Sequence, residues 1–379
     1  MYFMKFIVSS SYLLKHLSVV SGIISSNPVV PILENILFEI NNGNLLITAS
    51  DLQTTIMVEV QVESKEDGSI AIPSKTLIET LKNLPEQPVT FSIDKESYNI
   101  EINSDNGRYK LVGENATDFP KVPEVSDGYS TDINSKNLID AINYTIFAAS
   151  NDELRPAMTG IYFTLSKDSC TFVSTDGHRL VKYSRTDIKG DDLNHMMILP
   201  KKSMSLIRSS LLNEKASNIK LEFNASNAFF SIENIKITCR LIDEKYPDYE
   251  NVIPLDNNNK ISIDRIELLN SLKRISIYAN KTTNQVRFKV SGSELLVSSE
   301  DLDFSNEANE RLSCDHDGND IEIGFNAKFL IEILSNLNSK NVFLNLSEPN
   351  KAGLILPDNI DENEDITMLV MPVMLNDYD

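Results

Sequence analysis

The stretch GIYFTLSKDSCTFVSTDGHRLVKYS, residues 160–184, contains the pattern that decides the fold. Apolar and polar residues alternate on both sides of a polar turn, which is typical of two antiparallel strands with one buried face. Two other stretches repeat the pattern, ILFEINNGNLLITASDLQTTI at 36–56 and VRFKVSGSELLVSSEDLDFS at 286–305. Each contains an aspartate after its second strand, and these residues, Asp51, Asp176 and Asp301, are spaced 125 positions apart. The chain is therefore predicted to contain three copies of one domain.

Helical patterns flank each hairpin, because apolar residues recur there at intervals of three and four, as at Leu77, Ile78 and Leu81. The six helical segments are 9–26, 73–84, 135–151, 200–213, 264–281 and 326–340. Further alternating strand pairs follow, for example VTFSIDKESYNIEINS at 89–104. We therefore predict an α+β fold of three similar domains, each with two helices packed on antiparallel sheets. Clusters of turn residues place the domains at 1–127, 128–256 and 257–379.

Length and composition limit the classes of protein. A chain of 379 residues is longer than one compact core usually spans. No apolar run is long enough to cross a membrane, and the first residues do not form a signal peptide. The three cysteines are far apart and lack a CxxC pattern, which favours reduced thiols and a cytoplasmic location. We expect no membrane partner, no metal site and no cofactor.

Charge is unevenly distributed along the chain. The sequence has 55 acidic and 35 basic residues, a net charge of −20, yet the six helical segments together carry +8 and the remainder −28. Lys75 and Lys82 are seven residues apart, as are two further pairs, Lys201 with Arg208 and Arg274 with Lys281, so each pair is expected to share a helix face. The positive charge of any single helix is adequately explained by a basic face exposed to solvent. Five positive helices in an acidic chain favour a surface that follows phosphates without reading bases.

The segment TDGHRL, 175–180, allows two interpretations. Asp176 and His178 are a candidate catalytic pair for a hydrolase, but no GxSxG, HExxH or Walker pattern supplies the other parts. Asp51 and Asp301 lack a nearby His, which favours the aspartate as a turn residue in every repeat. The segment DHDGND, 315–320, begins like a calcium loop but has Asn326 at the twelfth position, so a polar hairpin turn is predicted.

Five short motifs occur within this threefold architecture: MKF at 4–6, TDGHRL at 175–180, YPDY at 246–249, IGFN at 323–326 and VMPV at 370–373. In this order they resemble the bacterial sliding clamp, the beta subunit of replicative DNA polymerase III, over nearly the whole chain. The resemblance implies a non-catalytic processivity factor. Its protomers would form a head-to-tail homodimer, a ring of six domains that encloses duplex DNA without sequence specificity. An acidic scaffold that binds proteins only is a weaker alternative.

The resemblance also implies a groove between the second and third domains. There the replicative polymerase catalytic subunit, the clamp loader and other clamp-binding proteins would insert a short linear motif. Methionines suit such a groove, since their flexible side chains adapt to several ligands. The implied groove residues are Met158, Thr175, Gly177, His178, Arg179, Leu180, Pro247, Val252, Phe329, Met371, Pro372, Val373, Met374 and Leu375, the last five on a C-terminal strand.

Two further sets of residues follow from the resemblance and the basic helices. The DNA-binding candidates are Lys75, Lys82, Arg155, Lys201, Lys202, Arg208, Lys273, Arg274 and Lys281. At the dimer interface, Tyr109 and Leu111 of one protomer would meet Ile277 and Tyr278 of the other. For these four residues the spacing is equally compatible with ordinary core packing.

The chain departs from the family pattern at several positions. Asn27 replaces an arginine of the first domain in some relatives, Asn251 replaces a basic residue, and Thr283 stands near a usual aromatic. The sequence also continues as NDYD, 376–379, where relatives commonly stop. We expect the changes at Asn251 and Thr283 to alter the ligand preference of the groove, and the acidic tail to disfavour acidic peptides. Asn27 stands where the arginine of those relatives touches DNA.

Overall fold

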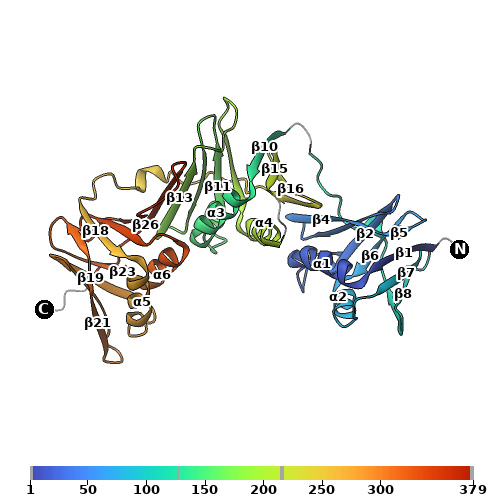
Figure 1. The fold of residues 1–379 in the computed structure, drawn as a ribbon, viewed down its shortest axis with the longest axis horizontal. Helices are drawn as coiled ribbons and strands as arrows, with labels where there is room; N and C mark the ends of the chain where they lie inside the picture. The colour runs from blue at the N-terminus through green and yellow to red at the C-terminus, as the bar shows by residue number, and fades with distance from the viewer. Residues whose placement is uncertain (1–2, 126–127, 214–216, 376–379) are drawn as a thin grey trace. The chain divides into compact units, whose positions relative to one another are not determined.

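The computed structural model describes residues 3–125, 128–213 and 217–375. The chain divides into two compact units, of which unit 1 comprises Met1–Ile139 and Lys202–Leu241, and unit 2 comprises Asp140–Lys201 and Ile242–Asp379. Both units combine helices with antiparallel sheets, as Figure 1 shows. The α+β fold predicted from the sequence is therefore confirmed. Among the described helices, none combines the length and apolar character that crossing a membrane requires.

Unit 1 contains two sheets. The five-stranded sheet has the order β5 (Glu63–Ser64), β1 (Phe3–Ser9), β7 (Pro88–Asp94), β8 (Asn99–Asn103) and β9 (Arg108–Val112). The eight-stranded sheet has the order β10 (Tyr129–Asn134), β15 (Asn218–Phe223), β16 (Asn227–Ile232), β17 (Ile235–Arg240), β4 (Thr54–Gln61), β3 (Asn44–Ser50), β2 (Asn35–Asn41) and β6 (Gly68–Pro73). Pairing of β17 with β4, at Ile235 and Val58, joins the first and second repeats in one sheet.

Unit 2 also contains two sheets. The nine-stranded sheet has the order β14 (His195–Pro200), β11 (Gly160–Leu165), β12 (Cys170–Thr175), β13 (Arg179–Arg185), β26 (Glu364–Val370), β25 (Gly353–Pro357), β24 (Asn341–Leu346), β18 (Asn259–Asp264) and β22 (Asp315–Asp317). The four-stranded sheet has the order β21 (Asn306–Ser313), β20 (Glu294–Asp301), β19 (Gln285–Ser291) and β23 (Ile321–Asn326). Pairing of β13 with β26 joins the second and third repeats.

Each predicted helical segment forms a helix in the described residues. They are α1 (Ser10–Val20), α2 (Ser74–Lys82), α3 (Ser135–Thr145), α4 (Lys201–Asn213), α5 (Arg265–Ile275) and α6 (Ala327–Asn336). Polar caps fix where two of them begin: Asp264 accepts hydrogen bonds from the backbone N–H groups of Ile266 and Glu267, and Asn326 accepts one from Lys328. Helix α1 packs on α2, and α5 packs on α6.

The three predicted hairpins form as β2–β3, β11–β12 and β19–β20. Phe38, Phe163 and Phe288 occupy equivalent places, and each side chain is at most 1% exposed. Each has an aromatic neighbour in its own repeat; the ring centroids of Phe163 and Phe172, for example, are 5.1 Å apart. The alternation seen in the sequence therefore corresponds to the buried faces of the hairpins.

Two sequence predictions are wrong in detail. Arg274 and Lys281 do not share a helix face, because α5 ends at Ile275 and Lys281 lies beyond it. DHDGND does not form a hairpin turn, because β22 pairs with β18 in the nine-stranded sheet while β23 pairs with β19 in the other. The segment instead crosses from one sheet to the next, and Gly318 has a φ of +148° where it passes closely over Asn259.

Candidate functional site: a groove built around Arg179

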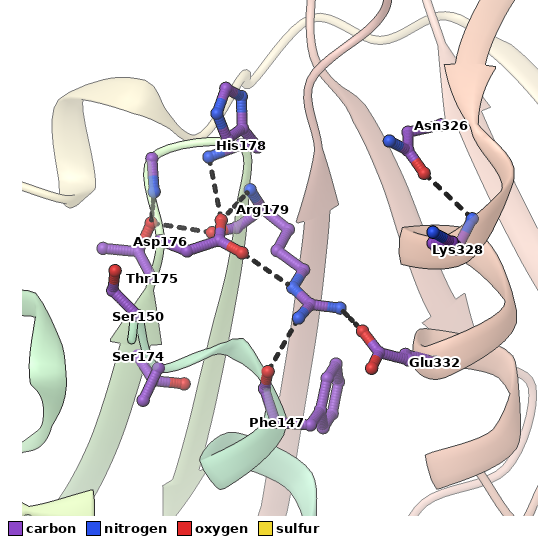
Figure 2. Close-up of polar contacts among 12 residues, drawn as sticks. Phe147, Ser150, Ser174, Thr175, Asp176, His178, Arg179, Asn326, Lys328 and Glu332 are labelled. Carbon is purple, nitrogen blue, oxygen red and sulfur yellow. Dashed lines mark hydrogen bonds and ion pairs between the residues drawn. The ribbon is translucent and has the colours of Figure 1, made fainter. Parts of the chain in front are cut away.

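The turn between β12 and β13 is held by its own polar side chains (Figure 2). The Asp176 Oδ1 atom accepts hydrogen bonds from the backbone N–H groups of His178 and Arg179, at 2.9 and 3.0 Å. Thr175 Oγ1 donates to the Arg179 carbonyl at 2.7 Å and accepts from the Gly177 N–H at 3.1 Å. Gly177 has a φ of +90°, which a residue with a Cβ adopts only with strain. The turn therefore presents His178 in a fixed position.

The same use of aspartate recurs in the other two repeats. Asp51 Oδ1 accepts from the N–H groups of Gln53 and Thr54, at 3.0 and 2.7 Å, and Asp301 Oδ1 accepts from Asp303 at 3.2 Å. A short carboxylate that caps the backbone two or three residues ahead stabilises the turn locally. The prediction that the aspartate is a turn residue of every repeat is confirmed.

Arg179 is the centre of the site. Its side chain is 8% exposed, and its guanidinium donates to three acceptors: Asp176 Oδ2 at 3.1 Å, the Phe147 carbonyl at 2.8 Å, and the Glu332 carboxylate. The same group lies 5.3 Å from the Phe147 ring centroid and 4.8 Å from that of Phe329. Asp176 lies in the turn, Phe147 follows α3, and Phe329 and Glu332 lie on α6. One side chain therefore connects three segments of unit 2 (Figure 2). A buried cation is stable here because its donors are satisfied and charge is paired.

His178 lies at the edge of this cluster. Its ring is stacked on Phe329, with centroids 5.9 Å apart and planes inclined by 18°. Its carbonyl accepts a hydrogen bond from the Met371 N–H at 2.7 Å, and the Val373 N–H donates to the Gly324 carbonyl at 2.8 Å. These contacts place the chain after β26 beside the turn.

The prediction of a C-terminal strand at residues 371–375 is wrong, because β26 ends at Val370. Only an isolated bridge between Val373 and Gly324 continues the pairing. Without a ladder partner on both sides, Met371 and Met374 remain 40% and 71% exposed. The tail 376–379 lies outside the described residues, and so does the effect predicted for it.

The apolar floor of the site is formed by a buried cluster. It includes Leu180, Val173, Leu369 and Tyr246 of the YPDY motif. Pro247 follows Tyr246, and Val252 is 52% exposed in a short 3-10 helix, Glu250–Val252. Met158 is half-buried in another, Pro156–Thr159. The structure thus brings His178, Arg179, Phe329 and Met371 into direct contact. Pro247 and Val252 follow the buried Tyr246 in the chain.

Sequence reasoning missed two residues that define the site, Phe147 and Glu332. Neither lies in a recognised motif. Glu332 lies three residues after Phe329 on α6, a spacing that puts both side chains on one helix face. That spacing could have linked Glu332 to the site, but an acidic residue on a helix is ordinarily exposed to solvent, so the spacing alone did not single it out. Asn251, a departure from the family pattern, donates to Asp248 Oδ2 at 2.6 Å and so lies beside a carboxylate.

The geometry does not match a catalytic Asp–His pair. One oxygen of Asp176 is used by backbone N–H groups and the other by Arg179. Throughout the described ranges, no hydrogen bond joins the Asp176 carboxylate to the His178 ring. A general base is normally oriented by a hydrogen bond to the ring nitrogen, so the arrangement fits a binding surface better than a hydrolase.

Several of the predicted DNA-binding cations already have acidic partners. Lys202 pairs with Asp51, Arg155 with Asp152 at 2.9 Å, and Arg274 with Glu310 at 2.6 Å. The basic side chains of these pairs are about half exposed to solvent, so each ion pair is weak and the cation can exchange its carboxylate for another anion. The positive charge available on these helices is therefore smaller than the sequence count implies.

The remaining basic candidates differ in environment. Lys201 Nζ donates to the Ala149 carbonyl and to Asn151 Oδ1, both at 2.9 Å, and burial lowers the pKa of its ammonium group. Lys281 Nζ donates to the Ile277 carbonyl at 2.9 Å. Arg208 is half-buried on α4. Lys75, Lys82 and Lys273 are exposed and form no ion pair with any described residue. Of these, Lys75 and Lys82 lie on α2 with the spacing of one helix face.

The predicted dimer residues lie at the edges of two sheets. Tyr109 and Leu111 are on β9, the edge strand of the five-stranded sheet in unit 1. Ile277 and Tyr278 follow α5, which packs against β21, the edge strand of the four-stranded sheet in unit 2. Ile277 is 64% and Tyr278 43% exposed, so neither is an ordinary core residue within one chain.

Comparison with known proteins gives the family. Models of the DNA polymerase III beta subunit match in order: its N-terminal domain at residues 4–123, its central domain at 132–248 and its C-terminal domain at 250–374. The chain belongs to the beta sliding clamp family. It is 28% identical to the beta sliding clamp of Pseudomonas putida over 98% of this chain and 100% of that protein, and 27% identical to that of Vibrio cholerae with the same coverage.

Solved structures of this family have the same fold. The DNA polymerase III beta subunit of Thermotoga maritima matches with a TM-score of 0.90 and 25% identity, covering 98% of this chain and 100% of the other. The sliding clamp of Pseudomonas aeruginosa bound to griselimycin matches with a TM-score of 0.92, 25% identity and the same coverage. The three-domain clamp architecture predicted from the repeat is therefore confirmed for this chain.

Proposed function

We propose that this chain is a DNA sliding clamp: a processivity factor that encircles duplex DNA without sequence specificity and has no catalytic activity of its own. The observation that carries the proposal is the match of all three beta-subunit domains, in order, to one chain. The geometry of Asp176 and His178, which fits a binding surface better than a catalytic pair, supports it. We place this activity in the cytoplasm.

Closure into a ring is supported by two sheet edges that have no further strand among the described residues. Strand β9 is the last strand of a sheet in unit 1, and β21 is the last strand of a sheet in unit 2. An exposed edge with apolar neighbours is a natural surface for strand addition. We propose that β9 of one protomer pairs with β21 of a second, with Tyr109 and Leu111 against Ile277 and Tyr278. Because the two edges differ, the contact is head-to-tail, and two such contacts close a dimer.

Contact with DNA is proposed for the basic candidates on the helices. The exposed Lys75, Lys82 and Lys273, with no acidic partner among the described residues, contribute most in this proposal. Lys202, Arg155 and Arg274 contribute only by exchanging a carboxylate for a phosphate. Weak phosphate contacts suffice when a ring holds the duplex topologically, and they leave the clamp free to slide.

The groove around Arg179 is proposed to bind the short linear motifs of the replicative polymerase catalytic subunit, the clamp loader and other clamp-binding proteins. Its exposed methionines and the stacked ring of His178 offer an apolar surface with a few polar groups, as peptide sites require. Arg179 itself is occupied by internal partners, so it supports the groove rather than a ligand.

The decisive experiment loads the protein on DNA with a clamp loader and compares circular with linear molecules. Retention on circular DNA and rapid loss from linear DNA are expected. Equal loss from both would contradict topological holding. Lys75→Glu together with Lys82→Glu should weaken DNA binding at low salt. The slope of the logarithm of the binding constant against the logarithm of the salt concentration should also fall by about two, because each lysine–phosphate contact releases roughly one counterion. An unchanged salt dependence would favour the acidic-scaffold alternative, and so would a stable monomer in solution.

A further inference from the structure

A cavity lies beside the YPDY segment. Its volume is about 480 Å³, and all its lining residues belong to unit 2. The walls come from β11, from the start of β14 and from residues 245–250. Pro247 lines this cavity and is also one of the residues of the proposed peptide groove. Because Pro247 belongs to both sets, a peptide in the proposed groove is expected to pass beside the cavity.

Three tyrosines form the apolar wall. The Tyr162 and Tyr246 rings are stacked, with centroids 4.7 Å apart and planes 10° apart, and Tyr249 meets Tyr162 edge-on at 6.1 Å. Tyr246 is buried beneath them, whereas Tyr162 and Tyr249 are half-exposed at the cavity. Met196 continues the surface and is 65% exposed. Such a wall offers the faces and edges of aromatic rings to a ligand.

Carboxylates define the polar rim. Asp248 and Glu250 are both exposed and both line the cavity, against one lysine, Lys245. Burial raises the pKa of the Tyr249 hydroxyl to about 12 and raises that of Tyr162 as well, and the negative charge of Glu250 adds to both increases. Aromatic faces beside two carboxylates favour a cation.

We propose that this cavity is a specificity subsite for a basic side chain, arginine above all, in partner peptides bound to the neighbouring groove. The inference rests on the proposed function, since the same peptide must occupy both sites. A guanidinium is planar and weakly hydrated, so it stacks on Tyr162 and Tyr249 while donating to the Asp248 and Glu250 carboxylates. Lys245 opposes this binding by its charge. The subsite would make this clamp favour partners whose motif is flanked by arginine.

The test uses fluorescein-labelled peptides with a Leu-Phe core, in pairs that differ only by arginine or its neutral isostere citrulline. The pairs place this residue at successive positions before and after the core, and fluorescence anisotropy gives each Kd. For at least one pair the arginine peptide should bind about fivefold more tightly at low salt, since an exposed cation–aromatic contact and an exposed ion pair are each modest. The preference should decline as salt screens the charges.

Variants assign the preference to this cavity. Glu250→Gln should bring the ratio of the two Kd values close to one, and Lys245→Gln should increase it. Glu244→Gln makes the same charge change in the same segment but outside the cavity, so it should leave the ratio unchanged. A ratio near one for every pair, or a ratio that survives Glu250→Gln, would overturn the subsite while leaving the groove intact.

The groove itself is checked separately with the citrulline peptides. Their binding should be weakened about 30-fold in Phe329→Ala, as expected for a central contact, and retained in Glu250→Gln. If no peptide binds the natural protein, the proposed groove is wrong and the subsite is wrong with it.

Discussion

The β12–β13 turn and the β20–β21 turn begin at equivalent aspartates, yet they have different environments. Asp176 and Asp301 both cap backbone N–H groups in their own turns. After Asp176 the chain presents Arg179, which is buried among α6, Phe147 and Phe329. After Asp301 it presents Leu302 and Phe304, which are 62% and 74% exposed. A repeated local device forms a site only where other segments supply partners for the residues it presents.

The largest effect should come from Arg179→Ala. Removal of the guanidinium leaves Asp176 and Glu332 without their cation and opens space between two aromatic rings, so the free energy of unfolding should fall by about 3 kcal/mol. The comparison is Lys202→Ala on α4, which removes the cation paired with Asp51, the equivalent aspartate of the first repeat; the Lys202 side chain is 54% exposed. That change should cost less than about 1 kcal/mol. Urea denaturation followed by circular dichroism compares the two, and equal losses would remove the distinction between the turns.

Phe329→Ala and Phe304→Ala test the aromatic residues at the two turns. Phe329 contacts both His178 and Arg179, so its truncation should weaken binding of a Leu-Phe peptide about 30-fold, as expected for a central contact. Phe304 lies in the turn after β20, and its truncation should leave that Kd unchanged. Peptide titrations of the two variants decide this, and comparable losses would place the binding surface elsewhere.

The aspartates themselves provide a smaller contrast. Asp176→Ala removes two backbone caps and an ion pair and should reduce the free energy of unfolding by about 2 kcal/mol. Asp301→Ala removes one backbone cap at 3.2 Å and a long contact to Asn280, and should cost about 1 kcal/mol. Denaturation midpoints measured under the same conditions give the order. A larger loss for Asp301→Ala than for Asp176→Ala would mean that the ion pair between Asp176 and Arg179 does not stabilise the fold.

The smallest effects concern the backbone. Gly177→Ala places a Cβ at a φ of +90° and 3.1 Å from an Arg155 nitrogen, which should cost about 1 kcal/mol. Ser305 has a φ of +53°, so Ser305→Gly should relieve strain and be neutral or stabilising by a few tenths of a kcal/mol. A lower melting temperature for Gly177→Ala and an equal or higher one for Ser305→Gly would support this difference between the two turns. Equal decreases in melting temperature would contradict it.

Much of the fold was predictable because it depends on local patterns. Phe38, Phe163 and Phe288 recur at a constant spacing, and each lies in the buried face of a hairpin. The helices were also found, although 264–281 was too long a prediction since α5 ends at Ile275. The predicted strand at 371–375 was wrong because an apolar sequence does not by itself make a strand: within the described ranges, only an isolated bridge pairs with this segment.

The sequence by itself determined the threefold repeat, the turn aspartates and the excess of positive charge on the helices, because side-chain periodicity and capping act within a few residues. Only the tertiary structure decided that Arg179 meets Phe147 and Glu332, that Lys202 is paired with Asp51, and that three tyrosines line a cavity beside Glu250. These partners are separated by 32 to 153 positions in the first two cases. Ion pairing and ring stacking act through space, so no local pattern records which distant residue a buried charge will meet.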